Sequence, residues 1–274
     1  MKKAIPFTKM AGAGNDFVVV EAPIKVDPKK LTIKVCDRTN GIGADGLLIL
    51  DKSKRADYQM RIINADGSEA EMCGNGARCM AVYIARHKSP KKKIFSLETL
   101  AGIILAQANG ETALVRLSDP TDYKPDIPVN VNGRTIHVHY IDTGVPHAII
   151  YVDHLKDINV QTIGPQIRHH KQFHPRGTNV DFVEQIDHHL VGVRTYERGV
   201  ENETKACGTG AVASALISYR KGNPAITTKD KAQMNVKTKS GEILRVTFDL
   251  KHGKITNVWL KGSAQFIAQG KYFL

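Results

Sequence analysis

The chain contains 274 residues, of which 42% are hydrophobic and 24% are charged, an ordinary globular composition with room for one large domain or two smaller ones. No apolar run approaches the ~20 residues that a membrane-spanning helix needs, and Met1-Lys2-Lys3 leads into no signal-peptide core, so we expect a cytoplasmic protein with no membrane partner. The formal net charge is +12, but the basic residues are scattered and no aromatic side chains interleave with them, so we expect no nucleic-acid partner.

Alternating apolar residues, turn residues and capping signals predict mostly strands in the first half of the chain. Asp27-Pro28 is typical of a helix start, with an N-cap residue followed by proline at the first helical position. Asn109-Gly110 is a strong hairpin signal. Strands are expected at 5–10, 17–21, 47–51, 58–64, 94–99, 102–108 and 112–117, and helices at 28–38 and 77–86.

The segment Gly41-Ile42-Gly43-Ala44-Asp45-Gly46 matches the pattern G-x-G-x-x-G. This pattern indicates a dinucleotide site when it follows a strand and opens a helix. Here it follows a helix and opens a strand. We therefore interpret its glycines as a turn that faces a ligand or another part of the backbone.

Three prolines, Pro120, Pro125 and Pro128, mark the best candidate for a linker. After them the order of elements repeats that of the first half, and a hairpin signal stands at Ser240-Gly241-Glu242. Strands are expected at 135–141, 147–152, 179–185 and 191–196, and helices at about 163–173 and 211–220.

The repeated order of elements indicates a duplicated domain. We expect one domain at 1–118, completed by a strand at 264–274 that crosses back to pair with it, and a second domain at 119–263. Hairpin signals outnumber helical crossovers, so the sheets should be antiparallel or mixed.

A five-residue motif occurs twice, as Cys73-Gly74-Asn75-Gly76-Ala77 and as Cys207-Gly208-Thr209-Gly210-Ala211, about half the chain apart. Each copy precedes a helical pattern, so its glycines leave backbone N–H groups free at a helix N-terminus. The helix dipole there favours the thiolate and is expected to lower the cysteine pKa. One such cysteine alone would most often be a small buried hydrophobe. The matched repeat favours an acid/base pair instead.

Two such loops that face each other across a pseudo-twofold axis would place two reduced thiols on opposite sides of one carbon. One thiolate could remove a proton and the opposite thiol could return one with inversion. The loop N–H groups would hold the neighbouring carboxylate and stabilise the enediolate. Cys36 and Cys79 are expected to be buried structural residues, and no Cys-x-x-Cys pair indicates a zinc site. No electron-sink cofactor is indicated, although composition alone does not exclude a pyridoxal-binding lysine.

From about Phe7 to the C-terminus, motifs in both halves resemble those of diaminopimelate epimerases. They are Asn15-Asp16-Phe17, Asn64-Ala65-Asp66-Gly67-Ser68-Glu69, Cys73-Gly74-Asn75-Gly76-Ala77-Arg78-Cys79, Thr178-Asn179-Val180-Asp181-Phe182, Tyr196-Glu197-Arg198-Gly199 and Ala206-Cys207-Gly208-Thr209-Gly210-Ala211. The resemblance implies a cofactor-independent isomerase that converts LL-2,6-diaminopimelate to the meso form for lysine and peptidoglycan synthesis. It also implies an α/β (α+β-like) fold of two pseudo-symmetric domains, each a mixed or antiparallel, barrel-like sheet around a central helix, with the site between them.

The same resemblance implies roles for individual residues. Cys73 and Cys207 would be the two bases, and His147 and Glu197 would tune their pKa. The groups around the reacting centre would be Asn15, Gly74, Asn75, Gly208 and Thr209. The distal carboxylate would be held by Asn64, Asn179 and Arg198, and the distal ammonium by Glu197, since a guanidinium binds a carboxylate bidentately.

Two positions depart from the family pattern and leave the strictness of substrate selection open. Val145 stands where an asparagine often precedes Pro-His, and Gly46 stands where some members carry glutamine. Two alternatives also remain: a proline-racemase-like amino acid racemase, and a non-catalytic thiol redox or binding protein. Proline has no second charged end, so Glu197 and Arg198 argue against the racemase. The sequence leaves open whether the chain forms a homodimer.

Overall fold

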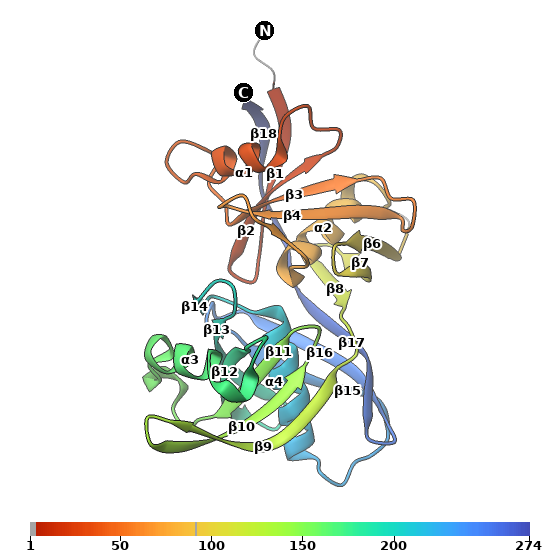
Figure 1. The fold of residues 1–274 in the computed structure, drawn as a ribbon. Coiled ribbons are helices and arrows are strands. Elements are labelled where there is room, and N and C mark those ends of the chain that lie inside the picture. The colour runs from red at the N-terminus through yellow and green to blue at the C-terminus, as the bar shows by residue number, and fades with distance from the viewer. Residues whose placement is uncertain (1–3, 91) are drawn as a thin grey trace. The chain divides into compact units, whose positions relative to one another are not determined.

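The computed structural model describes residues 4–90 and 92–274, and the chain divides into two compact units (Figure 1). The first unit comprises the chain up to Arg116 together with Gly262–Leu274, and the second comprises Leu117–Lys261. The two domains proposed from the sequence stay a prediction, because compactness alone does not show that either unit folds by itself. The mixed α/β fold with few helices is confirmed.

The first unit consists mainly of strands, close to the positions that the sequence predicts. Its strands are β1 Ala4–Gly12, β2 Asn15–Glu21, β3 Gly46–Asp51, β4 Tyr58–Asn64, β5 Glu69–Ala70, β6 Ile94–Thr99, β7 Gly102–Asn109, β8 Thr112–Arg116 and β18 Gln265–Phe273, and its helices are α1 Pro28–Cys36 and α2 Gly74–His87. As expected, Asp27 caps α1 by accepting hydrogen bonds from the backbone N–H groups of Lys29 and Lys30.

The pairing of strands in the first unit is mixed, as predicted. Sequential neighbours joined by turns pair antiparallel, whereas β2 and β3, and β4 and β6, pair parallel across the crossovers that contain α1 and α2. α2 is buried from Asn75 to Ile84 and packs against β1 to β4, β7 and β8. It is therefore the central helix of this unit, and its first turn is held rigidly.

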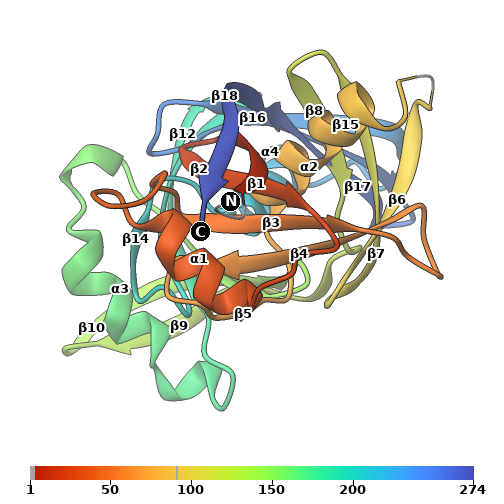
Figure 2. The same cartoon turned by 90° about the horizontal axis from the view of Figure 1, so that it is seen from above.

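The C-terminal strand β18 pairs antiparallel with β1, from Ala4 opposite Phe273 to Ala11 opposite Gln265. Figures 1 and 2 both show the dark blue β18 beside the red β1, although these strands lie at opposite ends of the chain. The predicted return of the tail to the first half is confirmed.

The second unit repeats this arrangement of elements. Its strands are β9 Thr121–Val131, β10 Arg134–Asp142, β11 Pro146–Tyr151, β12 Asn179–Asp187, β13 Leu190–Glu197, β14 Asn202–Thr204, β15 Lys229–Lys237, β16 Ile243–Lys251 and β17 Lys254–Ser263, its α-helices are α3 Val160–Arg168 and α4 Gly208–Gly222, and its short 3₁₀ helices are η1 Leu155–Asp157 and η2 Lys171–Phe173. Parallel pairs again form across the two α-helical crossovers, between β11 and β12 and between β13 and β15.

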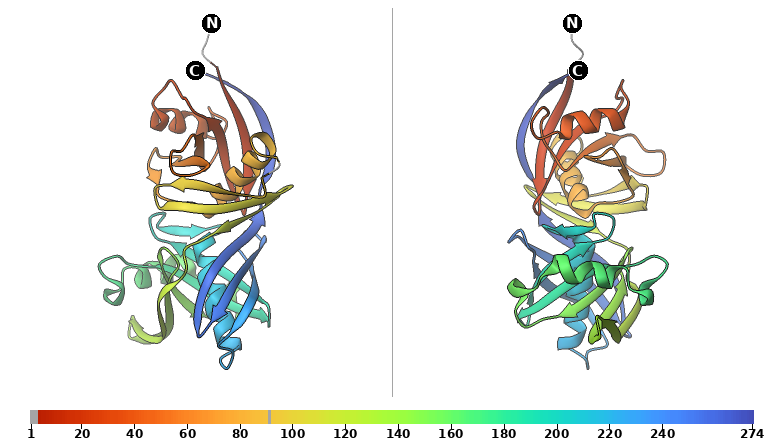
Figure 3. Two further views of the ribbon diagram at one scale, coloured as in Figure 1. Left: turned by 90° about the vertical axis from the view of Figure 1, so that its right-hand side faces the viewer. Right: turned by 60° about the vertical axis from the view of Figure 1, so that its left-hand side comes forward.

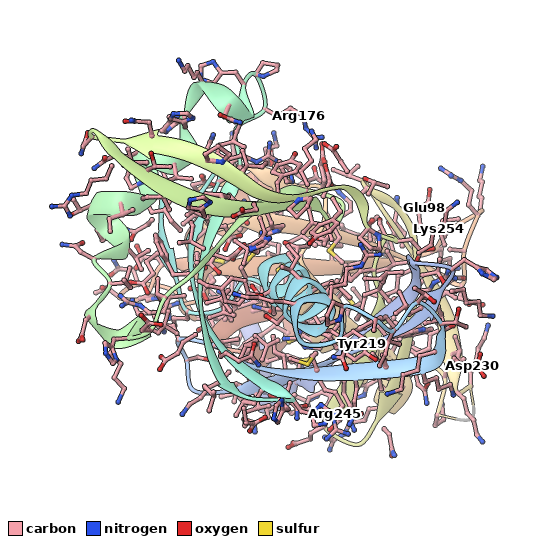
Figure 4. All side chains as sticks on the ribbon, turned by 90° about the horizontal axis from the view of Figure 1, so that it is seen from below. Glu98, Arg176, Tyr219, Asp230, Arg245 and Lys254 are labelled. Carbon is pink, nitrogen blue, oxygen red and sulfur yellow. The ribbon has the colours of Figure 1, made fainter. Side chains whose placement is uncertain are left out.

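The two α-helices of the second unit cover opposite faces of β12 and β13. Val180, Phe182 and Tyr196 belong to the apolar cluster that includes residues of α3, whereas the alternate residues Asp181 and Thr195 face the start of α4. Figure 3 shows α3 on the outside of the sheet. Figure 4, which labels Tyr219, shows α4 among the strands of this unit, as the buried run from Gly210 to Tyr219 requires.

Two sequence-based predictions about the second unit need correction. Of the proline-rich segment, Pro125 and Pro128 lie in β9, whereas Pro120 lies between β8 and β9, just after the boundary between the two units. β9 pairs with β10 and has no other partner strand among the described residues. Proline is tolerated in such an edge strand where its nitrogen, which carries no hydrogen, faces away from the neighbouring strand, so that no backbone hydrogen bond of the sheet is lost. The helix predicted at 163–173 begins earlier, at Val160, because Asn159 caps it, and it ends at Arg168 before η2.

Basic residues gather at the end of α2. Arg86 and His87 lie in the last turn of the helix, where positive charge is favourable, while Lys91 lies outside the described residues. Across the described residues, no helix has the length and apolar character needed to span a membrane.

Candidate active site

Cys73 is the N-cap residue of α2, and the backbone N–H of Gly76 donates to its Sγ atom at 3.4 Å. The side chain is half-buried. A Cβ at Gly76 would lie 3.0 Å from Cδ2 of Leu48, so glycine lets the first turn pack closely on β3. An N–H donor at the sulfur stabilises negative charge there, which suits a thiol that acts as a base.

Asn15 and Asn75, both predicted around the reacting centre, are hydrogen-bonded to each other. Nδ2 of Asn75 donates to Oδ1 of Asn15 at 2.6 Å, and Nδ2 of Asn15 donates to Oδ2 of Asp45 at 2.9 Å. Nη2 of the fully buried Arg78 donates to Oδ1 of Asn75 at 2.7 Å. A guanidinium and a carboxylate therefore fix the orientation of both amides beside Cys73.

Charged side chains support this network from β1, β2 and the loop that follows α1. Arg38 bridges Asp16 and Asp45 at 2.8 and 2.7 Å, and Lys9 lies 2.6 Å from Asp16. Partial burial acts to raise the pKa of Asp16, but the hydrogen bonds and charges of Arg38 and Lys9 outweigh it and hold this pKa well below its usual range.

Asn64 ends β4 and is exposed, with its Nδ2 atom donating to Oγ of Ser68 at 3.0 Å. It lies opposite Gly46 in the β3–β4 pairing. A Cβ at position 46 would lie 2.8 Å from the carbonyl oxygen of Ile63, so the backbone here favours glycine over a glutamine at this position.

Cys207 is the N-cap residue of α4, and its side chain makes no capping hydrogen bond. Its Sγ atom lies 3.4 Å from the hydroxyl of Thr209, whose carbonyl oxygen accepts from Thr143 at 3.3 Å. The cysteine is buried, unlike Cys73. The two motifs thus share a helix-capping position but differ in the surroundings of the sulfur.

The prediction of a lowered pKa is wrong for Cys207. Burial, and then the negative charges of Glu197 and Asp181, raise the pKa of this thiol well above its usual value. The nearby hydroxyl of Thr209 and N–H of Gly210 act in the opposite direction but do not overcome burial. Cys207 is therefore a neutral thiol, ready to donate a proton.

His147 is completely buried, and its Nδ1 atom lies 2.7 Å from Oδ2 of Asp181, which is also completely buried. Burial raises the pKa of the neighbouring Glu197, while Thr204 and His147 act to lower it and Asp181 to raise it. Both residues predicted to tune the cysteines thus lie in one electrostatic cluster with Cys207.

Asn179 and Arg198, predicted to hold the distal carboxylate, contact each other. Oδ1 of Asn179 accepts from the backbone N–H of Arg198 at 2.8 Å, and its Nδ2 atom donates to the carbonyl of Pro146 at 3.0 Å. Nη1 of Arg198 donates to the carbonyl of Arg176 at 3.1 Å. Asn179 therefore positions the backbone at Arg198.

The predicted residues thus fall into two groups, one in each unit. Cys73, Gly74, Asn75, Asn15 and Asn64 lie in the first, and Cys207, Gly208, Thr209, His147, Asn179, Glu197 and Arg198 lie in the second. Sequence reasoning missed the supporting residues Asp45, Arg78 and Asp181. Arg78 and Asp181 stand inside the motifs that carry the resemblance, which is the signal that could have found them. Cys36 and Cys79 are buried, as predicted.

In the part of the chain that the structure describes, no group of three or more histidine, cysteine, aspartate or glutamate side chains could hold a metal ion.

The sequence model of diaminopimelate epimerase matches residues 7–121 and 139–267. A diaminopimelate epimerase from Caldanaerobacter subterraneus subsp. tengcongensis is 40% identical, with 97% of this chain and 98% of the relative covered. One from Aquifex aeolicus is 41% identical, with 97% and 96% covered. The chain belongs to the diaminopimelate epimerase family. As a member of this family it is an isomerase, so the non-catalytic alternative is excluded.

Solved structures with the same fold extend beyond epimerases of diaminopimelate. A PhzF-family phenazine biosynthesis protein from Bacillus anthracis has a TM-score of 0.75 at 17% identity, covering 99% of this chain and 100% of that one. A hydroxyproline epimerase from Agrobacterium vitis has a TM-score of 0.71 at 14% identity, covering 100% and 94%. At such identities the likeness shows the fold of this family member and not its substrate.

Proposed function

We propose that this chain converts LL-2,6-diaminopimelate to the meso form without a cofactor, with one of Cys73 and Cys207 removing the α-proton and the other protonating the opposite face. The observation that carries the proposal is the repeated motif, which makes each cysteine the N-cap of a buried helix. Family membership supports the substrate. We also propose that the product serves lysine and peptidoglycan synthesis in the cytoplasm, and that the enzyme acts as a homodimer.

The proposed reaction begins with one thiolate and one thiol. The thiolate takes the α-proton, the electron pair passes into the adjacent carboxylate to give an enediolate, and the opposite thiol protonates the other face. Backbone N–H groups of Gly74, Asn75, Gly208 and Thr209 would stabilise the enediolate, and each such donor is worth about 10²–10³ in rate. Because an amino acid α-proton is very weakly acidic, general acid/base catalysis alone, worth about 10²–10⁴, would not suffice.

The two cysteines differ in a way that fits one direction of this reaction. Cys73 accepts an N–H hydrogen bond and is half-buried, whereas Cys207 is buried with a raised pKa. The resting enzyme would therefore hold Cys73 as the base and Cys207 as the acid. The reverse direction requires Cys207 to lose its proton.

The distal end of the substrate would be recognised by Arg198, Asn64 and Asn179 through its carboxylate and by Glu197 through its ammonium. Val145 removes one amide from this end relative to other family members. Burial raises the pKa of Glu197, and a bound ammonium group would place a positive charge beside this carboxylate.

The test is to incubate the purified chain with LL-2,6-diaminopimelate and resolve the stereoisomers by chiral chromatography. We expect the meso form to accumulate. L-Proline should not be turned over, whereas the racemase alternative requires that it is. Cys73→Ala and Cys207→Ala should each lose turnover while keeping the circular dichroism spectrum. Near-wild-type turnover in either folded variant would overturn the two-cysteine assignment.

A further inference from the structure

Three buried side chains form a hydrogen-bonded chain beside the first turn of α4. The Thr195 hydroxyl donates to Oδ1 of Asp181 at 2.7 Å, and Oδ2 of Asp181 lies 2.7 Å from Nδ1 of His147. Neither His147 nor Asp181 has any exposed side-chain surface. The roles assigned from the sequence include His147 but neither Asp181 nor Thr195.

The contacts at both oxygens of Asp181 bear on the choice of tautomer. An ionised carboxylate accepts at both oxygens, and Nδ1–H of His147 is the donor that Oδ2 then needs. A neutral ring with its hydrogen on Nδ1 has its lone pair on Nε2. Nε2 is buried and has no hydrogen-bond partner among the described residues. Because an unmet buried acceptor costs free energy, this atom is available for a proton.

Asp181 and Thr195 pack against the first turn of α4, which Cys207 caps. A Cβ at Gly210 would lie 2.4 Å from Oδ1 of Asp181 and 3.2 Å from the hydroxyl oxygen of Thr195, so glycine is required for α4 to start this close. The strand that carries His147, β11, also packs against α4 and runs parallel to β12, which carries Asp181. The two strands β11 and β12 thus fix the position of the His147 imidazole relative to the start of α4.

We propose that Asp181 is a positioning residue, which holds His147 in its Nδ1–H tautomer so that Nε2 accepts the proton of Cys207. This inference rests on the proposed function, in which Cys207 must become the base in one direction. In this proposal His147 receives the proton, and Asp181 acts only through it.

The proton transfer is balanced within these residues. The S–H bond of Cys207 breaks, an N–H bond forms at Nε2, and a thiolate and an imidazolium remain. The ionised Asp181 stabilises the imidazolium, as a buried carboxylate does for the histidine of a serine protease. Burial that raises the pKa of Cys207 makes such an acceptor necessary, since the thiol is shielded from water.

The tautomer can be tested directly on the substrate-free enzyme labelled with ¹⁵N-histidine. His147→Gln would identify the His147 resonances, and two-bond correlations then show which ring nitrogen carries hydrogen. We expect Nδ1–H in the native chain and in Thr195→Val, which keeps the bond from His147 to Asp181. A native His147 with hydrogen on Nε2 alone would overturn the inference. This measurement needs no turnover, so it is independent of the proposed function.

Asp181→Asn supplies the kinetic test, because its amide can donate to Nδ1 and reverse the tautomer at nearly constant volume. The analogous change in a serine protease lowers kcat by about 10⁴. We expect a reversed tautomer and a kcat at least ~100-fold lower in the direction of the reaction that uses Cys207 as the base, with KM within about threefold. Asp187→Asn, at the exposed end of the same strand, is the matched control and should leave both constants unchanged. A reversed tautomer with native kcat would overturn the inference.

Discussion

Nδ2 of Asn75 donates to Oδ1 of Asn15 at 2.6 Å, which joins the first turn of α2 to the start of β2. The pair is anchored by Arg78 on one side and by Asp45 on the other. Four side chains from three parts of the first unit, β2, α2 and the residue before β3, thus hold the backbone around Cys73.

Asn75→Ala should lower the free energy of unfolding by about 1–3 kcal/mol, because it leaves the buried guanidinium of Arg78 and the amide of Asn15 each short of a partner. Urea denaturation followed by circular dichroism measures this change. Asn109→Ala, at an exposed hairpin, should change the same free energy by less than about 0.5 kcal/mol. Equal effects of the two substitutions would show that the network does not hold the loop.

Asp16 should make stability depend on acid pH. Its pKa in the folded chain is depressed, so its contribution is present above the unfolded pKa of about 3.9 and is lost as pH falls through the lower folded value. The midpoint of urea unfolding should therefore fall as pH drops from about 4 towards 2. Asp16→Asn should weaken this dependence, and an unchanged slope would contradict the role given to Lys9 and Arg38.

Cys207 should react slowly with iodoacetamide in the free enzyme at neutral pH, because its raised pKa keeps it protonated. The rate should rise only above the ordinary thiol pKa of about 8.5. Cys36 is a useful internal reference, since burial raises its pKa to about 11. Peptide mass spectrometry of each site across pH measures the rates. Fast alkylation of Cys207 at pH 7 would contradict the assignment of a neutral thiol.

Arg198→Leu should reduce kcat/KM for diaminopimelate by a factor of about 10–100, the loss of a charged hydrogen bond worth ~1.5–3 kcal/mol. Lysine, which lacks the second carboxylate, should be a poor substrate for the native enzyme. Arg176→Leu is the matched control. It removes an exposed guanidinium paired with Asp142 but keeps the carbonyl that Arg198 contacts, so little activity should be lost. Similar losses of activity in both variants would show that Arg198 does not bind the distal carboxylate.

Most elements of the fold could be predicted because strands, caps and hairpin turns are written in local patterns, as Asp27 for α1 and Asn109-Gly110 for the β7–β8 hairpin illustrate. The return of β18 to β1 was also predictable, from its strand pattern and the repeated order of elements. The strand β9 could not be predicted, because prolines in the local sequence indicate a break, and only the tertiary context makes this segment an edge strand. The prediction of a lowered pKa for Cys207 failed for a similar reason. The helix dipole is a local effect, whereas burial and the charges of Glu197 and Asp181 come from residues distant in the sequence.

The two-cysteine reaction, the central claim, is tested most directly by running the conversion of LL-2,6-diaminopimelate in D₂O and measuring deuterium in product and recovered substrate during the first few per cent of turnover. Two separate thiols predict that the product carries one deuterium at its inverted α-carbon, because the donor thiol has exchanged with solvent, while the recovered substrate carries none. Equal deuterium in product and recovered substrate from the start would mean that one base serves both faces, and would contradict the assignment of Cys73 and Cys207 as a pair.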